Sequence, residues 1–251
     1  MAVIPAIHIE NLHFHYEKES GTFLNGLSLT IPENDRFGLF GPNGAGKSTL
    51  MNLMTGILKP ELGTIELFGT DLQQNHKKAV KKIFGFVPQD FSFYNELSPL
   101  ENLEFFGAWY GMSAKETRMA SDELLEVMNL TSVRNKSVGQ FSGGMKRRVN
   151  LAIGVMHKPK ILFLDEPTVG VDVQTRHAII EFLLELNKKG MTLVYTSHQL
   201  SEAESLCENI ALMDEGKIIA QNKLSILCEE YKEEGLEGLF LNLTGKAYRD
   251  M

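Results

Sequence analysis

The most recognisable chemical pattern in the chain is a glycine-rich loop that matches G-x-x-x-x-G-K-[ST] and ends in Lys47-Ser48. Backbone N–H groups of such a loop surround phosphate oxygens, the lysine reaches the terminal phosphates, and the serine hydroxyl coordinates Mg²⁺. A chance match in an unrelated loop is the alternative. An apolar strand candidate before it and a helical run after it favour an ATP or GTP site, with these predicted nucleotide-binding residues: Gly41, Pro42, Asn43, Gly44, Ala45, Gly46, Lys47, Ser48 and Thr49.

A second candidate anion site is the stretch Ser142-Gly143-Gly144, which precedes an amphipathic run over residues 145–157. Serine is a favoured N-cap, and two glycines after it leave the first helical N–H groups uncovered by side chains. Taken alone, the stretch is more often an ordinary helix cap than a ligand site. Its position ahead of the next motif favours the ligand site.

That next motif is a short apolar run, residues 161–164, which ends in two carboxylates, Asp165 and Glu166. An unbroken apolar run is typical of a strand buried on both faces of a parallel sheet, and ligands bind at the carboxyl ends of such strands. Asp165 suits an Mg²⁺ site, and Glu166 suits a base that deprotonates the water attacking the terminal phosphate. A solvated Asp-Glu turn is the alternative.

The order of these motifs over about residues 5–222 resembles the nucleotide-binding subunit of an ABC transporter, with a strand that ends near His198 completing the pattern. The resemblance implies an α/β fold with a P-loop NTPase core, a mixed, mainly parallel sheet and an N-terminal antiparallel β part. It also implies an inserted helical subdomain at about 90–158 within an ATP-binding domain of residues 1–222. Residues 223–251 are predicted to add a short C-terminal helix.

The resemblance assigns further roles one residue at a time. Tyr16 stands where the family stacks an aromatic ring on adenine, although Phe14, His13 and His15 are rivals and an aromatic in an early strand is usually core. The expected cofactors are ATP and Mg²⁺.

Gln89 matches the glutamine that touches Mg²⁺ and the attacking water, its alternative being a polar turn residue beside Pro88. His198 matches the histidine that contacts the γ-phosphate, although a lone histidine at a strand end is usually structural. Asp172 falls in the loop that crosses between two subunits.

In this family the Ser142–Gly144 stretch closes over the ATP of a second subunit packed head-to-tail. The predicted partner is therefore a second copy of the chain or a sister ATPase subunit, together with an integral membrane permease on a separate chain. Met145 departs from the glutamine that many relatives carry, which puts a side-chain contact to the partner's nucleotide in doubt.

Composition limits the function further. The formal net charge of −7 argues against broad nucleic-acid binding. No apolar stretch approaches membrane-spanning length and the start shows no secretory leader, so the expected location is cytoplasmic, peripheral on the inner face of the cell membrane. The basic run Lys146-Arg147-Arg148 is expected on the outer face of a helix. The two cysteines, Cys207 and Cys228, show neither metal nor redox spacing.

These motifs need elements to hold them in place. The patterns predict β structure over about 7–31, strands near 37–40, 63–68, 83–87, 161–164 and 192–195, and helices over 47–55, 98–109, 114–128, 145–157 and 174–189. Ser98-Pro99-Leu100-Glu101 has capping-box spacing, which marks the start of its helix.

Seven aromatic residues lie between Phe91 and Tyr110. The resemblance puts the permease groove just after Gln89, so Phe91, Phe93 or Tyr94 is predicted to line it, with a core role as the alternative. The signature stretch and the tail are similar to those of export ATPases. The competing hypothesis is a non-transport ABC ATPase acting on ribosomes or nucleic acid; such relatives usually carry two nucleotide domains or a coiled-coil insert, which this chain lacks.

Overall fold

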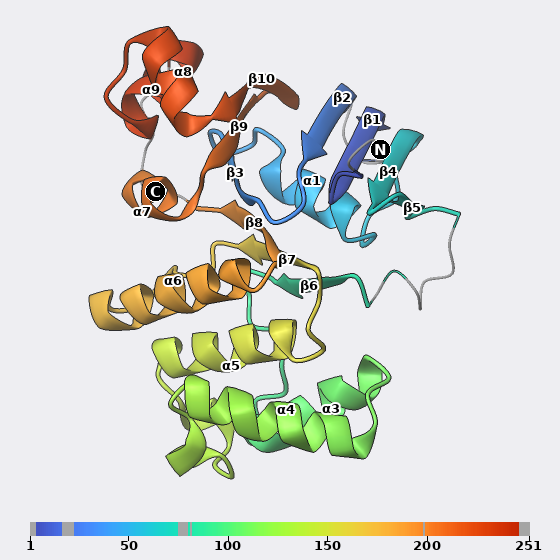
Figure 1. Ribbon diagram of the computed structural model, residues 1–251, viewed down its shortest axis with the longest axis vertical. Coiled ribbons are helices and arrows are strands. Elements are labelled where there is room, and N and C mark those ends of the chain that lie inside the picture. The colour runs from blue at the N-terminus through green and yellow to red at the C-terminus, as the bar shows by residue number, and fades with distance from the viewer. Residues whose placement is uncertain (1–3, 17–22, 75–79, 81, 198, 246–251) are drawn as a thin grey trace.

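The computed structural model describes residues 4–16, 23–74, 80, 82–197 and 199–245, and their strands form two sheets (Figure 1). The antiparallel sheet has the order β2-β1-β4-β5 and consists of β1 (Ile7–Phe14), β2 (Leu24–Ile31), β4 (Leu62–Leu67) and β5 (Thr70–Asp71). The other sheet has the order β10-β9-β3-β8-β7-β6 and is parallel except for the β9–β10 pair. The predicted α/β architecture with an N-terminal antiparallel part is confirmed.

Side chains of the six-stranded, mainly parallel sheet alternate between two hydrophobic cores. The strands are β3 (Arg36–Phe40), β6 (Phe84–Val87), β7 (Ile161–Asp165), β8 (Thr192–Thr196), β9 (Asn209–Asp214) and β10 (Lys217–Lys223). In β7, Ile161 and Phe163 join one core, whereas Leu162 and Leu164 join the other. An unbroken apolar run satisfies both faces, which explains the sequence pattern of this strand.

The helices are divided between these two faces. α1 (Lys47–Met54) packs with the antiparallel sheet in the core that contains Ile161 and Phe163. α5 (Gly143–Val155) and α6 (Val173–Lys188) pack in the other core, on the opposite face of the parallel sheet (Figure 1). The phosphate-loop helix and the helix that begins with Ser-Gly-Gly therefore lie on opposite sides of one sheet.

A helical layer covers the outer side of α5. It consists of α3 (Pro99–Trp109) and α4 (Ala114–Val127), with short 3₁₀ turns η1 (Thr131–Val133) and η2 (Val138–Gln140) leading into α5 (Figure 1). The predicted capping box at the start of α3 is present: Glu101 N donates to Ser98 Oγ at 3.3 Å, and Ser98 N donates to the Glu101 carboxylate at 2.8 Å.

The C-terminal part differs from the prediction of one short helix. α7 (Leu200–Leu206) is followed by the β9–β10 hairpin and then by two helices, α8 (Leu224–Tyr231) and α9 (Leu236–Thr244). Lys232 ends α8 in a left-handed conformation, φ 58°, which turns the chain without a glycine. Leu236, Leu239 and Phe240 are fully buried in the core that also contains α7. None of the described helices has the length and apolarity needed to cross a bilayer.

His157, between α5 and β7, ties the helical layer to the sheet. Its Nε2 lies 3.0 Å from the Phe84 carbonyl oxygen in β6, and its ring stacks on Tyr110 at 3.7 Å. Among the described residues Nδ1 has no hydrogen-bond partner, so a second proton would be buried without an acceptor. Burial lowers the pKa of His157 to about 4, against the opposing effect of the bond to Phe84.

This buried neutral imidazole predicts an acid-dependent loss of stability. Between pH 6.5 and about 4 the unfolded chain binds a proton at His157 that the folded chain excludes, so the free energy of unfolding falls as the pH is lowered. The loss from this group is about 3 kcal/mol. Urea unfolding at a series of pH values measures it: His157→Gln should flatten the slope in this window. His177→Gln, at a side chain 75% exposed, should keep the wild-type slope. A wild-type slope in His157→Gln would contradict the assignment.

Candidate functional site

The phosphate-loop residues connect the end of β3 to α1 through closely packed backbone. Gly46 is the N-cap of α1 with φ 106°, a conformation that favours glycine. A Cβ on Gly41 would collide with the carbonyl oxygen of Met213 at the end of β9. The loop is held from outside as well, because Gly216 N donates to the Ala45 carbonyl at 3.0 Å. Backbone packing therefore explains why glycine is needed at 41 and 46.

Lys47 places a buried cation at this loop. Its Nζ donates to the carbonyl oxygens of Gly41 at 2.8 Å and Pro42 at 3.2 Å, and the residue is 8% exposed. Burial lowers the pKa of Lys47, while Glu166 and Asp165 act in the opposite direction. These two carboxylates are therefore close enough to stabilise the ammonium.

The two carboxylates stand at the end of β7, and Thr196 of the neighbouring strand β8 holds both residues in position. Thr196 Oγ1 donates to Asp165 Oδ1 at 2.7 Å, and Glu166 N lies 3.2 Å from both the carbonyl oxygen and Oγ1 of Thr196. Glu166 is 6% exposed and has φ 50°, which is uncommon for a residue with a Cβ. Such strained backbone concentrates at functional sites.

Gln89 meets Glu166 across the β6–β7 pair. β6 runs parallel to β7 with Val87 opposite Leu164, so both residues follow their strands at the same edge of the sheet. Gln89 Nε2 donates to Glu166 Oε2 at 3.1 Å. The structure thus brings together three of the predicted catalytic residues: Lys47, Gln89 and Glu166.

The segment that carries Gln89 is fastened by α5. Arg147 Nη1 donates to the Pro88 carbonyl oxygen at 3.2 Å, Asn150 Nδ2 donates to the same oxygen at 3.3 Å, and the Arg147 guanidinium lies over the Phe91 ring. The expectation of an outward basic run is wrong for Arg147, which is 3% exposed. Gly144 and Leu151 stand three residues before and four residues after Arg147, so all three lie on the same face of the helix. This spacing in the sequence already indicated that Arg147 is on the buried face.

Ser142 is the N-cap of α5, with its Oγ accepting from Met145 N at 3.3 Å. A Cβ on Gly144 would lie 3.1 Å from Thr175 Oγ1 in α6, so the helix start packs against the segment that Asp172 caps. Met145 packs on the core beside α5. Core packing accounts for the apolar residue at this position.

Tyr16 is the aromatic beside the phosphate-loop helix. Its OH lies 2.9 Å from Thr49 Oγ1, and its ring contacts Phe14 and Phe23 edge-on. Of its rivals, Phe14 is buried, while His13 and His15 lie beside Asn11 and Glu61. The adenine contact of Tyr16 remains a prediction. The predicted residue His198 lies outside the described residues.

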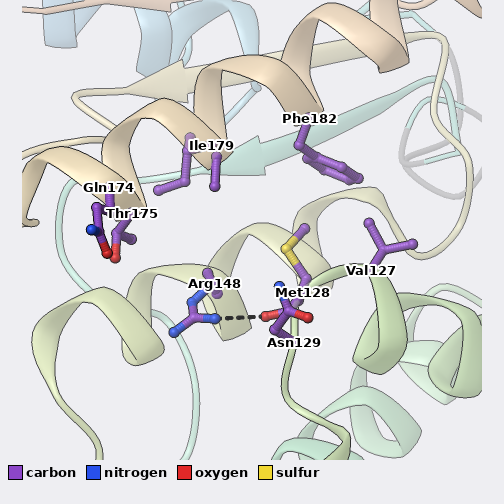
Figure 2. A pocket seen from close by; sticks show the side chains of 9 residues that line it. Val127, Met128, Asn129, Arg148, Gln174, Thr175, Ile179 and Phe182 are labelled. Atoms are coloured by element: carbon purple, nitrogen blue, oxygen red, sulfur yellow. Dashed lines mark hydrogen bonds between the residues drawn. The ribbon is translucent and has the colours of Figure 1, made fainter.

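Several cavities in the described part of the chain lie away from the phosphate loop. One of about 290 Å³ separates α6 from α4 and α5; Gln174, Ile179 and Phe182 face it from one side and Val127 and Arg148 from the other (Figure 2). Another, of about 330 Å³, is lined almost entirely by aromatic residues: Ser92, Phe93, Tyr94, Phe105, Phe106 and Trp109. None of the predicted nucleotide-binding residues lines either cavity.

Comparison with known proteins decides the family, because the model of the ABC transporter family matches residues 24–169. The chain belongs to the ABC transporter family. It is an ATP-binding subunit and an ATPase. It is 42% identical over 219 residues to the linearmycin resistance ATP-binding protein of Bacillus subtilis, covering 87% of this chain and 70% of that protein. It is 39% identical to the Nod factor export ATP-binding protein I of a Rhizobium species, covering 83% and 68%.

Solved ABC structures share the fold. An ATP-binding subunit of an ABC transporter matches with a TM-score of 0.87 at 26% identity, over 95% of this chain and 99% of that one. A dimeric ATP-binding cassette bound to ADP and phosphate matches with a TM-score of 0.79 at 28% identity, over 87% and 98%. The transport hypothesis is confirmed over the ribosomal or nucleic-acid one; ABC ATPase subunits of this kind bind adenine nucleotides, form dimers and work with membrane components.

Proposed function

We propose that this ABC ATPase powers export through a permease on a separate chain, using ATP-driven, head-to-tail dimerisation and hydrolytic opening. The observation that carries the proposal is the contact of Gln89 with Glu166 at 3.1 Å, beside the buried Lys47 ammonium. Gln89 begins the segment leading to the helical layer, so this contact joins the hydrolytic site to the part of the molecule that would receive a permease. The ATP-binding domain is taken as residues 1–222, with the helical subdomain at about 90–158 and an extension at 223–251.

In this proposal Glu166 is the catalytic base and Lys47 binds the terminal phosphates. The Glu166 carboxylate accepts the proton of the attacking water, and the Gln89 amide orients that carboxylate through their hydrogen bond. The backbone bonds of Glu166 to Thr196 hold the base in position, which avoids reorganisation during the reaction. His198 is assigned the γ-phosphate contact and Tyr16 the adenine contact.

The proposed Mg²⁺ ligands are Ser48, Gln89 and Asp165. All three offer oxygen, the donor that Mg²⁺ prefers. When bound, Mg²⁺ would neutralise phosphate charge.

Ser142, Gly143 and Gly144 are proposed to bind the ATP of the second subunit. The α5 helix and the α1 helix pack on opposite faces of the parallel sheet, which supports a site completed by a partner. The Asp172 loop, packed against the α5 start through Thr175, would cross the same interface. A second copy supplies a complete set of these residues, and a sister subunit is the other arrangement.

The aromatic cavity beside α3 is the proposed permease-docking site, which would hold the ATPase on the inner face of the membrane. Tyr94, Phe105 and Trp109 are 47%, 43% and 62% exposed, an unusual aromatic concentration on a surface. Phe93 and Tyr94 line it, whereas Phe91 instead stacks on Phe93 beneath Arg147. Export is favoured because the two relatives described above carry export or resistance names.

Glu166→Gln tests the base. The amide keeps the size of the side chain but cannot take a proton, so turnover should fall by about 10²- to 10⁴-fold while ATP binding is retained. Phosphate release and equilibrium nucleotide binding measure the two quantities, and Lys47→Ala, which removes a phosphate-binding cation, serves as the binding-deficient comparison. Full hydrolysis by Glu166→Gln would refute the base assignment.

Ser142→Arg tests the sharing of sites. The long cation should obstruct the partner's nucleotide, so ATP binding by the monomer stays near normal while the ATP-bound dimer is lost. Ser142→Ala is the matched control, because it removes the cap to Met145 N at a cost of about 1 kcal/mol without filling the surface. Size-exclusion chromatography with ATP in the Glu166→Gln background measures the dimer. Normal dimer formation by Ser142→Arg would contradict the proposed sharing.

Phe93→Ser tests the docking site. Removing an aromatic anchor from an interface typically costs 1 kcal/mol or more, so recovery of an integral membrane partner should drop about tenfold while nucleotide affinity is unchanged. Pulldown from detergent-extracted membranes measures recovery, with Ile226→Ser on the exposed side of α8 as the control. Undiminished recovery would remove Phe93 from the interface, and recovery of ribosomal proteins alone would contradict the transport assignment.

A further inference from the structure

Glu202, in α7, is a buried carboxylate that belongs to none of the sequence motifs. The residue is 8% exposed. Its Oε2 accepts from Thr168 Oγ1 at 2.6 Å and from Tyr195 OH at 2.8 Å, and its Oε1 forms an ion pair with Arg176 Nε at 2.8 Å. Burying a charge is costly, and an apolar side chain would pack here without that cost. The carboxylate therefore needs a reason beyond stability.

The three partners of Glu202 come from three different segments around the hydrolytic site. Thr168 lies two residues after Glu166, Tyr195 is in β8 directly before Thr196, and Arg176 is in the first turns of α6. Thr168 and Tyr195 are 1% and 0% exposed. Burial raises the pKa of Tyr195 and the nearby Glu202 raises it further, so its hydroxyl remains a donor.

The backbone around Glu166 requires support on both sides. Glu166 has a left-handed φ of 50°, and its own N–H is held by Thr196. On the following side, Thr168 is held by Glu202, which also holds Tyr195 next to Thr196. Strained conformations persist only when their surroundings over-determine them.

Arg176 extends this network toward the Ser-Gly-Gly helix. Its backbone N–H makes the helical bond to the carbonyl oxygen of Asp172, the N-cap of α6. The adjacent Thr175 packs against Gly144 at the start of α5. One carboxylate thus contacts the Glu166 loop through a hydrogen bond and, through an ion pair, the helix that packs against the proposed second anion-binding stretch.

We propose that Glu202 is a positioning residue for ATP hydrolysis, which holds the Glu166 loop in its reactive geometry through Thr168 and links that loop to α6 through Arg176. The proposal rests on the assignment of Glu166 as the base. It differs from that assignment because Glu202 is proposed to act only through the residues it contacts, Thr168, Tyr195 and Arg176.

The test compares two isosteric substitutions at buried threonines. Thr168→Val removes the hydroxyl bonded to Glu202, whereas Thr192→Val removes an equally buried hydroxyl that accepts from Asn34 N at 2.9 Å at the other edge of the sheet. We expect Thr168→Val to lower kcat by about tenfold to a hundredfold with KM for ATP nearly unchanged, because misplacement of a catalytic group affects the chemical step. Thr192→Val should retain the wild-type kcat.

Glu202→Gln provides a second variant. The amide of glutamine replaces one acceptor oxygen with a donor. Either the hydroxyls of Thr168 and Tyr195 or the guanidinium of Arg176 therefore lose their acceptor, and kcat should fall as in Thr168→Val. In the Glu166→Gln background neither substitution should lower the residual rate further, since both act through Glu166. A merely structural role would lower the melting temperature without this dependence on Glu166.

The outcomes separate this proposal from the one on which it rests. The role of Glu202 is overturned if Thr168→Val has the wild-type kcat. It is also overturned if Thr168→Val lowers the rate by the same factor in the Glu166→Gln background as in the wild type. In either case an inactive Glu166→Gln still supports the base. Full hydrolysis by Glu166→Gln overturns the base itself, and the positioning role with it. If Glu202→Gln does not fold, Thr168→Val alone decides.

Discussion

The buried ammonium of Lys47 is the constraint around which the site is arranged. A cation that is mostly removed from water needs anionic or carbonyl oxygens close by. The chain supplies both the loop carbonyls and the two carboxylates at the end of β7. The P-loop follows β3, which pairs with β8, and β8 in turn pairs with β7. The carboxylates can reach Lys47 because β7 and β3 run parallel and end at the same edge of the sheet. This charge arrangement depends on the strand order, on the packing of the sheet between two cores, and on the hydrogen bond from Thr196 to Asp165.

The same arrangement explains how a single domain can hold two helix starts that are candidates for binding anions. A sheet buried on both faces needs a helical cover on each, and each cover brings its own N-terminus to the carboxyl edge. One N-terminus belongs to α1 and the other to α5. The sheet separates these two helix starts, and this separation is the basis of the proposal that Ser142, Gly143 and Gly144 bind the ATP of a second subunit.

How much could be predicted from the sequence depended on how local the determining interactions are. The P-loop, the capping box at Ser98 and the Asp165-Glu166 pair follow from contiguous residues, and the structure contains the elements they require. A role for Gln89 toward Mg²⁺ and the attacking water was implied only by family resemblance. Its contact with Glu166 was not predicted, because that contact depends on the parallel pairing of β6 with β7, 77 residues apart.

Other features depend on contacts that no short motif encodes. Arg147 was expected to be exposed because its charged neighbours masked the apolar spacing of its face. The network of Glu202 joins residues from four elements or loops, and the division of the tail into α8 and α9 depends on one lysine adopting a left-handed turn. Each of these required the tertiary structure.

The packing of α9 on α7 constrains where the chain can be altered by protein engineering. Leu236, Leu239 and Phe240 cover the helix that carries Glu202, and Glu204 of that helix accepts a hydrogen bond from Leu236 N. A deletion that begins before Leu236 would therefore open the hydrophobic core behind the loop that carries Glu166, although α9 lies far from that loop in sequence. A fusion partner attached after Gly245 would leave that core closed, which makes the end of α9 the safer place for a tag or a fluorescent reporter.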